Sequence, residues 1–202
     1  MIRKSKTAIS EGEFENREDL VEIRLPDEVK RIGADAFYGC KRLRSISLPD
    51  GITKIGANAF LDCNSLSFFT EGVCRYLGNE KKPRLALVDA AYDGRENTEL
   101  IIPDGVRLLS DSVFYYFLEL GSVVLPESLE YIGDGAFYHC EKITSVKLGG
   151  KLKSIGKNAF YGCDSLIDVY FGGNEDEWNR VKIAAGNTRL KKAKIHFNSK
   201  DK

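Results

Sequence analysis

Five cysteines and two histidines are the residues of this sequence best suited to metal binding or redox chemistry. No two cysteines have the C-x-x-C spacing of a zinc or redox site. Neither His139 nor His196 has a second histidine at metal-ligand spacing, so both are expected to be structural. We therefore expect free thiols, no bound metal and no cofactor.

The sequence also lacks the motifs of nucleophilic and phosphate chemistry. Serines are abundant, but no G-x-S-x-G element occurs and no His-Asp pair accompanies a serine. Gly172-Gly173 is not followed by the G-K-[ST] of a phosphate loop. Asp50 and Asp104 each follow a proline, and turn chemistry explains both. We predict that the chain is not an enzyme.

Composition excludes several classes of partner. Thirty Lys and Arg residues balance thirty Asp and Glu residues, and this argues against nucleic acid, because phosphate binding requires a basic excess or patch. No apolar run is long enough to span a bilayer, and the basic N-terminus lacks the apolar stretch of a signal peptide. The expectation is a cytoplasmic protein, or a mature or excised piece of a secreted one.

A 23-residue repeat accounts for most of the cysteines. The text of residues 32–40, IGADAFYGC, returns in similar form at 55–63, 132–140 and 155–163, and both 55 − 32 and 155 − 132 equal 23. Two weaker copies begin at Ile9 and at Leu109. Four of the five cysteines share one repeat position, which is typical of a small apolar filler rather than of a reactive thiol. Cys74 lies outside this series.

Each repeat predicts one turn of a solenoid. Apolar and polar residues alternate at 46–48, as in a half-buried strand, and the Pro-Asp-Gly at 49–51 predicts a corner. Val29 and Ile32 predict an opposite wall, Gly33 permits a second tight turn, and 36–37 predicts a short helical turn. Because one unit cannot bury its own apolar face, we predict an α/β repeat solenoid. Its core contains a phenylalanine ladder: Phe14, Phe37, Phe60, Phe114, Phe137 and Phe160.

The spacing is broken at two places. Phe60 and Phe114 are 54 residues apart, which is 23 + 31, and the extra residues 73–88 predict a β-hairpin with its turn at 78–83. Stacking is expected to resume at 100–103, and residues 175–182 around Trp178 predict a short capping helix. We predict a single domain over residues 1–202. Its repeats lie at about 9–31, 32–54, 55–70, 71–108 (with the hairpin), 109–131, 132–154 and 155–171, with a C-terminal cap at 172–197.

The repeat resembles the BspA-type leucine-rich repeats of bacterial proteins, whose pattern is LPxxVxxIGxxAFxxCxxLxxI. The resemblance covers roughly residues 9–197, and the hairpin text at 76–88 and the ending at 169–173 also look like family features. It implies a right-handed leucine-rich-repeat stack with a curved parallel β-sheet on the concave face and short strands and helical turns on the other side. Members of the family are often surface or secreted proteins that bind other proteins, and the motif contains no catalytic residue.

By analogy with such folds, the concave face is the expected binding surface. Two stripes of strand residues would form it: Glu22, Ser45, Phe68, Ser122, Ser145 and Asp168, and beside them Arg24, Ser47, Thr70, Val124, Lys147 and Tyr170. The first hypothesis is a protein-binding module for adhesion or scaffolding. The alternatives are a carbohydrate-binding surface with Phe68 and Tyr170 as stacking platforms, and a fragment of a larger cell-surface protein.

Overall fold

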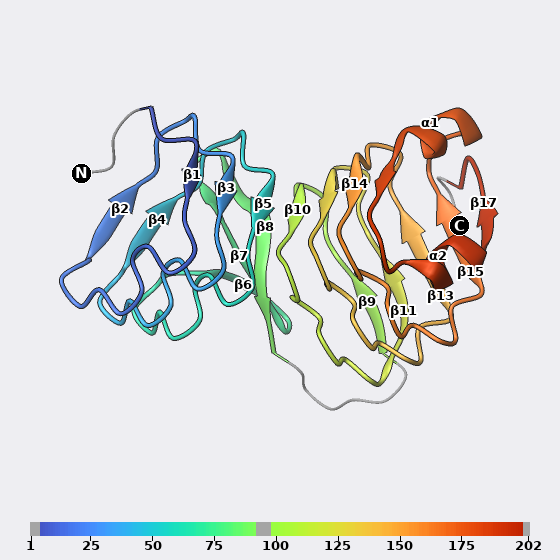
Figure 1. Cartoon of the computed structure of the whole chain (residues 1–202), viewed down its shortest axis with the longest axis horizontal. Helices are drawn as coiled ribbons and strands as arrows, with labels where there is room; N and C mark the ends of the chain where they lie inside the picture. Colours follow the sequence, from blue (N-terminus) through green and yellow to red (C-terminus); the bar gives the residue numbers. More distant parts are fainter. Residues whose placement is uncertain (1–4, 92–97, 200–202) are drawn as a thin grey trace. The chain divides into compact units, whose positions relative to one another are not determined.

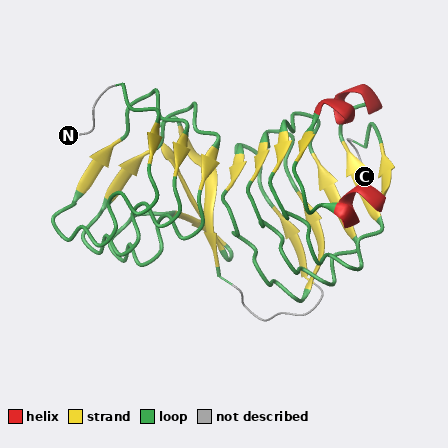
Figure 2. Ribbon diagram, in the orientation of Figure 1, coloured by secondary structure: helices red, strands yellow, loops and turns green. Residues whose placement is uncertain are grey.

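The computed structural model describes residues 5–91 and 98–199. The chain is a β-solenoid of about eight turns, built mostly from parallel strands with few helices (Figure 2). This confirms the predicted repeat solenoid. The chain divides into two compact units, unit 1 (residues 1–91 and 108–111) and unit 2 (residues 92–107 and 112–202). That the whole chain acts as one domain stays a prediction.

Unit 1 begins with two sets of parallel strands. The short strands β1 (Ala8–Ile9), β3 (Arg31–Ile32) and β5 (Lys54–Ile55) form one wall, and the longer strands β2 (Glu22–Arg24) and β4 (Ser45–Ser47) form another (Figure 1). Residues 23 positions apart lie opposite one another in both sets. One repeat of the sequence therefore makes one turn of the chain.

An antiparallel insertion completes unit 1. Strand β6 (Phe69–Glu71) pairs with β7 (Cys74–Asn79), and β7 pairs with β8 (Lys82–Ala90), which confirms the predicted hairpin. Strand β8 also pairs in parallel with β10 (Leu108–Leu109). Leu87 lies opposite the second residue of β10 and is fully buried. The hairpin's second strand therefore supplies the short strand of the atypical repeat.

Five parallel strands form the longer sheet of unit 2. They follow the order β17-β15-β13-β11-β9, so each strand pairs with the next one of its kind along the chain. Stacking resumes where the sequence predicts it, since Ile101 lies opposite Val124. The bounds are β9 (Thr98–Ile101), β11 (Leu120–Val124), β13 (Ser145–Leu148), β15 (Asp168–Phe171) and β17 (Lys194–His196).

The C-terminal part of unit 2 contains the helices. Short strands β12 (Tyr131–Ile132), β14 (Ser154–Ile155) and β16 (Lys182–Ile183) pair in parallel. Helices α1 (Glu175–Arg180) and α2 (Thr188–Lys192) lie at the C-terminal end of the unit (Figures 1 and 2). A capping box begins α1, in which the Asn174 side chain accepts from the Glu177 N–H and the Glu177 carboxylate accepts from the Asn174 N–H. The helix predicted at 175–182 is shorter, because Lys182 enters β16. The sequence did not predict α2.

The phenylalanine ladder forms the core, as predicted. Neighbouring ring centroids lie 5.1–5.4 Å apart, with planes within 17° of parallel. Phe37 stacks between two rings in unit 1, and Phe137 stacks between two rings in unit 2. Five of the six rings are buried, while Phe14 is only half-buried because no described repeat precedes it.

Glycine at position 33 serves close packing rather than the tight turn that the sequence suggested. The left-handed backbone angles of this repeat occur at Asp35 (φ 53°) and Gly39 (φ 66°) instead. A Cβ at Gly33 would lie 2.4 Å from the backbone nitrogen of Glu11 in the preceding turn, so only glycine fits. The expected helical turn at 36–37 is a hydrogen-bonded turn, in which the Tyr38 N–H donates to the Asp35 carbonyl at 2.9 Å.

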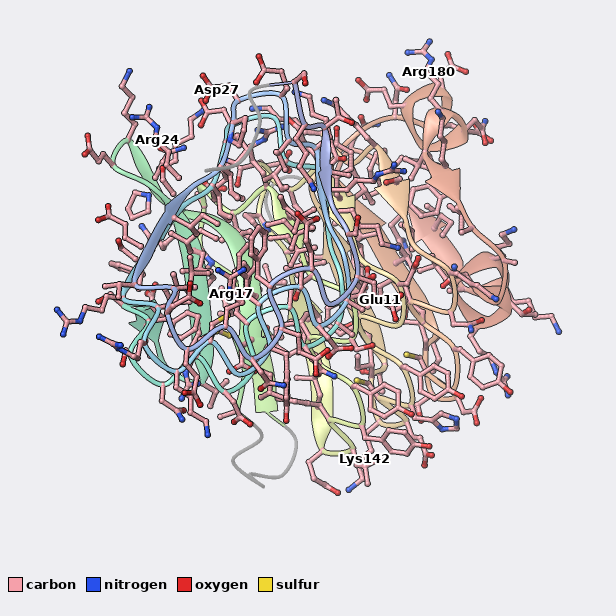
Figure 3. The ribbon with its side chains drawn as sticks, turned by 60° about the vertical axis from the view of Figure 1, so that its left-hand side comes forward. Glu11, Arg17, Arg24, Asp27, Lys142 and Arg180 are labelled. Carbon is pink, nitrogen blue, oxygen red and sulfur yellow. The ribbon has the colours of Figure 1, made fainter. Side chains whose placement is uncertain are left out.

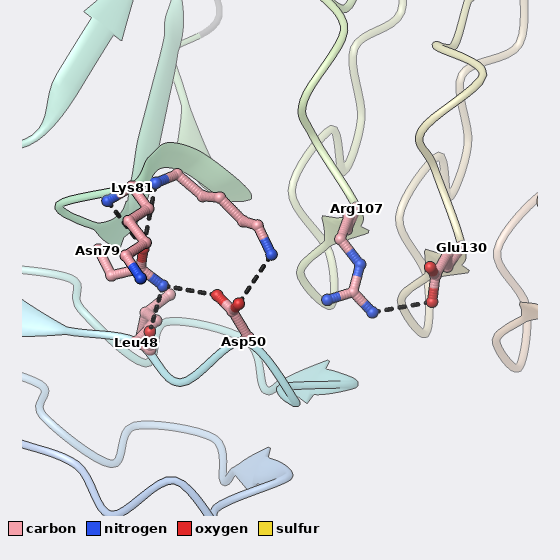
Figure 4. Close-up of polar contacts among 7 residues, drawn as sticks. Leu48, Asp50, Asn79, Lys81, Arg107 and Glu130 are labelled. Atoms are coloured by element: carbon pink, nitrogen blue, oxygen red, sulfur yellow. Dashed lines mark hydrogen bonds and ion pairs between the residues drawn. The ribbon is translucent and has the colours of Figure 1, made fainter.

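An ion-pair cluster joins three successive turns of unit 2 on the short-strand side. The carboxylate of Glu130 accepts hydrogen bonds at 2.8 Å from Arg107 (Figure 4) and at 2.8 Å from Lys153. Burial alone would raise the pKa of Glu130, but the two cationic donors outweigh it and the pKa is lowered. The three residues are 23 positions apart, so the cluster is a repeated structural contact.

Candidate functional site

The repeated cysteines form hydrogen bonds between turns. Each Sγ–H donates to the carbonyl of a ladder phenylalanine 26 residues earlier, at 2.9 Å from Cys40 to Phe14 and at 3.2 Å from Cys163 to Phe137. All five thiols are free and buried. Burial raises the pKa of Cys63 and of Cys140 to about 12 and that of Cys74 to about 11. These thiols are therefore suited to packing rather than to nucleophilic chemistry.

The five thiols should react fully in the denatured protein and slowly in the folded protein. A thiol reagent should modify five groups under denaturing, non-reducing conditions, because all five cysteines are free. In the folded protein the same reagent should react slowly even at mildly alkaline pH, since the thiolate is the reactive species and the raised pKa keeps it scarce. The reaction can be followed by absorbance. Recovery of three groups or fewer from the denatured protein would contradict the prediction.

The described residues contain no group of three or more His, Cys, Asp or Glu side chains that could hold a metal ion. His139 lies at a turn with φ 55°, where it stacks on Tyr116 at 5.1 Å and contacts Glu141 at 3.2 Å. His196 lies on β17. Its Nε2 is 2.7 Å from the Asp168 carboxylate, and its ring stacks on Tyr170 at 4.6 Å. His196 was not among the predicted binding residues, but it lies opposite Tyr170 and so extends that predicted stripe of unit 2 by one strand.

In unit 1 the residues of the predicted stripes lie side by side on two strands only, β2 and β4. Glu22 lies opposite Ser45, and Arg24 lies opposite Ser47. The next turn keeps its regular backbone pairing with the preceding turn only as far as Ser67, whose N–H donates to the Arg44 carbonyl at 3.1 Å.

The placement of Phe68 and Thr70 in these stripes is wrong. Strand β6 leaves the stack and pairs antiparallel with β7, with Thr70 opposite Arg75. Phe68 is half-buried, and the Arg75 guanidinium lies 5.6 Å from its ring centroid. The neighbouring Phe69 is the exposed ring, with 43% of its surface accessible. The physical reason is that the 31-residue repeat offers β6 an antiparallel partner within its own hairpin.

The departure of β6 creates a groove of about 820 Å³ within unit 1, here called the hairpin groove. Its floor consists of strands β2 and β4, including the predicted residues Glu22, Arg24, Ser45 and Ser47. Its wall consists of Phe69, residues 76–81 and Pro83. The volume lies within the range of small-ligand sites. Small serines on the floor leave room above the sheet, and the hairpin encloses one side.

Hydrogen bonds fasten the hairpin to the end of β4 (Figure 4). The Leu48 N–H donates to the Gly78 carbonyl at 2.9 Å, and the Asn79 amide donates to the Leu48 carbonyl at 3.1 Å and to the Asp50 carboxylate at 2.8 Å. Lys82 adds an ion pair with Asp50 at 2.7 Å. The oxygen of the Asn79 side chain also accepts from two backbone N–H groups of the hairpin turn. One asparagine therefore joins the wall of the groove to its floor.

The groove contains exposed charges of both signs. Glu22, Asp27 and Glu80 are acidic, and Arg24 and Lys81 are basic. Figure 3 shows Arg24 and Asp27 at the surface of the molecule. Within residues 5–91 and 98–199 none of the five forms an ion pair, whereas Asp50 is engaged by Lys82. A partner that enters the groove would find both charged donors and charged acceptors available.

Unit 2 retains the predicted stripes in register. Ser122, Ser145 and Asp168 lie side by side on β11, β13 and β15. The second stripe is Val124, Lys147 and Tyr170, and all six side chains are partly exposed.

The structure lengthens both stripes with residues that the sequence analysis did not include. Glu99 and Ile101 precede them on β9, and Lys194 and His196 follow on β17. Ile101 is 62% exposed, which is unusual for an isoleucine on a strand. The signal was present in the sequence, because Ile101 lies one residue before the Ile102-Pro103 corner, as Val124 lies before Leu125-Pro126.

One family model matches most of the chain. The model of the BspA type leucine rich repeat region matches residues 2–80 and 87–200 in six copies. No curated protein gives a significant match.

Three bacterial leucine-rich-repeat structures are similar to this chain. The protein from T. pallidum is 28% identical with a TM-score of 0.37, over 82% of this chain and 66% of that one. A protein from Eubacterium ventriosum is 21% identical with a TM-score of 0.47, over 80% and 44%. One from Bacteroides ovatus is 23% identical with a TM-score of 0.38, over 96% and 59%.

This chain thus spans 44% to 66% of the length of those three proteins. The family model, in contrast, covers nearly all of the present sequence, and it confirms the resemblance inferred from the repeat. The chain belongs to the BspA-type leucine-rich-repeat family.

Proposed function

We propose that the chain is a non-catalytic module that binds a partner protein, and that the hairpin groove is its primary contact. The observation that carries this proposal is the enclosure of the β2–β4 face by the hairpin wall, fastened through Asn79. Pockets with a formed wall and a few convergent polar groups are the default binding sites of proteins. The stripes of unit 2 are a second candidate contact.

A protein fits these surfaces better than a carbohydrate. Sugar stacking requires open faces of aromatic rings. The ring of Phe68 is covered on one side by Arg75, and that of Tyr170 by His196. Phe69 in the groove is likewise covered by Arg84, whose guanidinium carbon lies 5.3 Å from the ring centroid. Exposed charges of both signs instead favour the mixed side chains of a protein.

Filling the hairpin groove with a large side chain tests whether the partner binds there. Ser47→Trp places a large ring on the groove floor, and it should weaken binding to a protein recovered by affinity capture by about tenfold or more, because hot-spot contacts cluster in such pockets. Ser65→Trp is the matched control, since Ser65 is exposed but lies outside the groove lining. Affinity can be measured by surface plasmon resonance, with circular dichroism as the check on folding.

The remaining outcomes distinguish the candidate surfaces. If Ser47→Trp binds like the wild type and Tyr170→Ala binds weakly, the contact lies on the stripes of unit 2. If a glycan array captures the chain and proteins do not, the carbohydrate alternative replaces the proposal. Full binding by all variants would contradict both proposed surfaces.

The partner and the location are proposed from the family alone. Members of the family that bind other proteins at the cell surface support a surface or secreted role, with a host or surface protein as partner. None of the helices in the described parts of the chain is long and apolar enough to cross a membrane.

A further inference from the structure

An exposed ladder of tyrosines runs along the turns of unit 2, outside the phenylalanine core. Tyr138 stacks on Tyr115 with ring centroids 5.0 Å apart and planes 9° apart, and on Tyr161 at 5.2 Å and 15°. Tyr116 lies 4.6 Å from Tyr115. Tyr115 is 49% exposed and Tyr161 is 47% exposed, so the two ends of the ladder are open to solvent.

The repeat position of this ladder does not require tyrosine. In unit 1 the same position holds Glu15, Tyr38 and Leu61, so Tyr38 has no aromatic neighbour of its own kind there. The core phenylalanines already stack from turn to turn in both units. Unit 2 therefore carries a second, solvent-facing aromatic stack in addition to the phenylalanine core.

The phenols of this ladder are accessible to an oxidant from solvent, whereas the thiols are not. The five thiols are buried and protonated, since burial raises the pKa of Cys140 to about 12 and also raises that of Cys163. The phenol rings of neighbouring turns lie nearly parallel with centroids about 5 Å apart, so radicals formed on two of them would be direct neighbours. Rotation of the exposed side chains would then bring together the ring carbons beside the two hydroxyl groups.

We propose that the tyrosine ladder of Tyr115, Tyr138 and Tyr161 is a site of oxidative dityrosine cross-linking between successive turns of unit 2. The oxidant is hydrogen peroxide acting through a haem peroxidase. Each of two phenols loses one electron and one proton to become a phenoxyl radical. The radicals join through the carbons ortho to oxygen, and the ring hydrogens at those carbons move to restore the two hydroxyl groups. The net loss of two hydrogens reduces one peroxide to two molecules of water.

The cross-link would join residues 23 positions apart and so hold adjacent turns together in the unfolded chain. Such a link stabilises a fold mainly by restricting the unfolded ensemble, as a disulfide does. This step rests on the surface or secreted location of the proposed function, where the ladder would meet peroxides. The five cysteines are free and buried, whereas Tyr115 and Tyr161 are exposed, so the ladder offers the accessible side chains for a link between turns. The ladder would supply the covalent link instead.

In the experiment, a dilute solution of the chain of residues 1–202 is treated with peroxidase and hydrogen peroxide, and the digested peptides are mapped by mass spectrometry. We expect monomeric protein in which a peptide with Tyr138 is joined to one with Tyr115 or Tyr161, with the loss of two hydrogens and a higher midpoint of thermal unfolding. Tyr138→Phe keeps the ring stack, so it should fold normally while these cross-links fall to background.

Tyr38 is the internal control, because it occupies the same repeat position without a stacked tyrosine. The experiment is repeated with a small photochemical one-electron oxidant, because a small molecule can reach tyrosines that the large peroxidase cannot approach. The inference is overturned if neither oxidant produces an intramolecular link, if only covalent dimers form, or if Tyr38 is cross-linked as often as Tyr138. It is also overturned if Tyr138→Phe leaves the yield of links between turns unchanged.

Discussion

Replacing Phe137 by alanine is expected to lower the free energy of unfolding of unit 2 by about 3–5 kcal/mol. The ring is fully buried and is stacked on Phe114 at 5.2 Å and on Phe160 at 5.1 Å. Removing it leaves a cavity with a ring on either side, and neither neighbour can move in without breaking the hydrogen bonds of its own turn. The Phe137 N–H itself donates to the Ala159 carbonyl at 2.8 Å, so the backbone is held in place too.

Phe14→Ala is the matched comparison, because Phe14 is a ladder ring with only one stacked neighbour, Phe37 at 5.2 Å. It is half-buried, so the change removes less buried surface and should cost clearly less. Urea unfolding followed by circular dichroism measures both losses. Equal losses would show that stability does not depend on contacts between neighbouring turns, which is the basis of a solenoid.

The sequence predicts the core because every turn places apolar residues at the same buried positions. Phe37, Phe60, Phe137 and Phe160 recur at one position of a 23-residue period, and a period of that length implies stacked turns whatever the surface residues are. The strand registers, with residues 23 positions apart facing each other, follow directly from the period. The hairpin was predictable as an insertion, since residues 73–88 interrupt the repeat and contain Gly, Asn and Pro where a turn is expected.

The candidate site was predicted less well, and both failures occur where the period is broken. Phe68 and Thr70 were extrapolated from the period, but β6 exchanges a parallel neighbour for the antiparallel β7. Which strand β6 pairs with depends on the relative stability of the two backbone pairings, and this difference cannot be read from one sequence. Ile101 and His196 were omitted because the 31-residue repeat and the final 26-residue spacing shifted the alignment. The hairpin groove does not follow from the repeat, because it needs the hairpin wall and the floor of β2 and β4 together.

The C-terminal cap shows a second limit of prediction from the sequence. The sequence indicates an atypical last turn, but it does not show how the last regular turn satisfies its backbone groups. In four earlier turns the ladder phenylalanine N–H donates to an alanine carbonyl of the next turn, as Phe114 does to Ala136 at 2.8 Å. Phe160 has no such alanine. Its N–H donates instead to the side-chain oxygen of Asn187 at 2.9 Å.

Asn187→Ala is therefore expected to destabilise unit 2 by about 2–4 kcal/mol, since each buried polar group left unsatisfied costs about 1–3 kcal/mol. The side chain is 1% exposed and makes three hydrogen bonds. Besides accepting from Phe160, its amide donates to the carbonyls of Gly156 at 2.8 Å and Ala184 at 3.0 Å. Alanine removes the donor and the acceptor together, so the Phe160 N–H and the Ala184 carbonyl lose these partners, whereas the Gly156 carbonyl still accepts from the Ala159 N–H at 3.4 Å.

Asn179→Ala is the control, because Asn179 is exposed on α1 and its loss should change stability by less than about 0.5 kcal/mol. Urea unfolding gives the global loss, and amide hydrogen exchange shows where it arises. In Asn187→Ala the Phe160 N–H should exchange much faster than in the wild type, while the Phe114 N–H, which keeps its alanine carbonyl, should change far less. If Phe160 stays protected and the stability falls by no more than in Asn179→Ala, Asn187 is not what closes the last turn, and the cap holds through the packing of α2 alone.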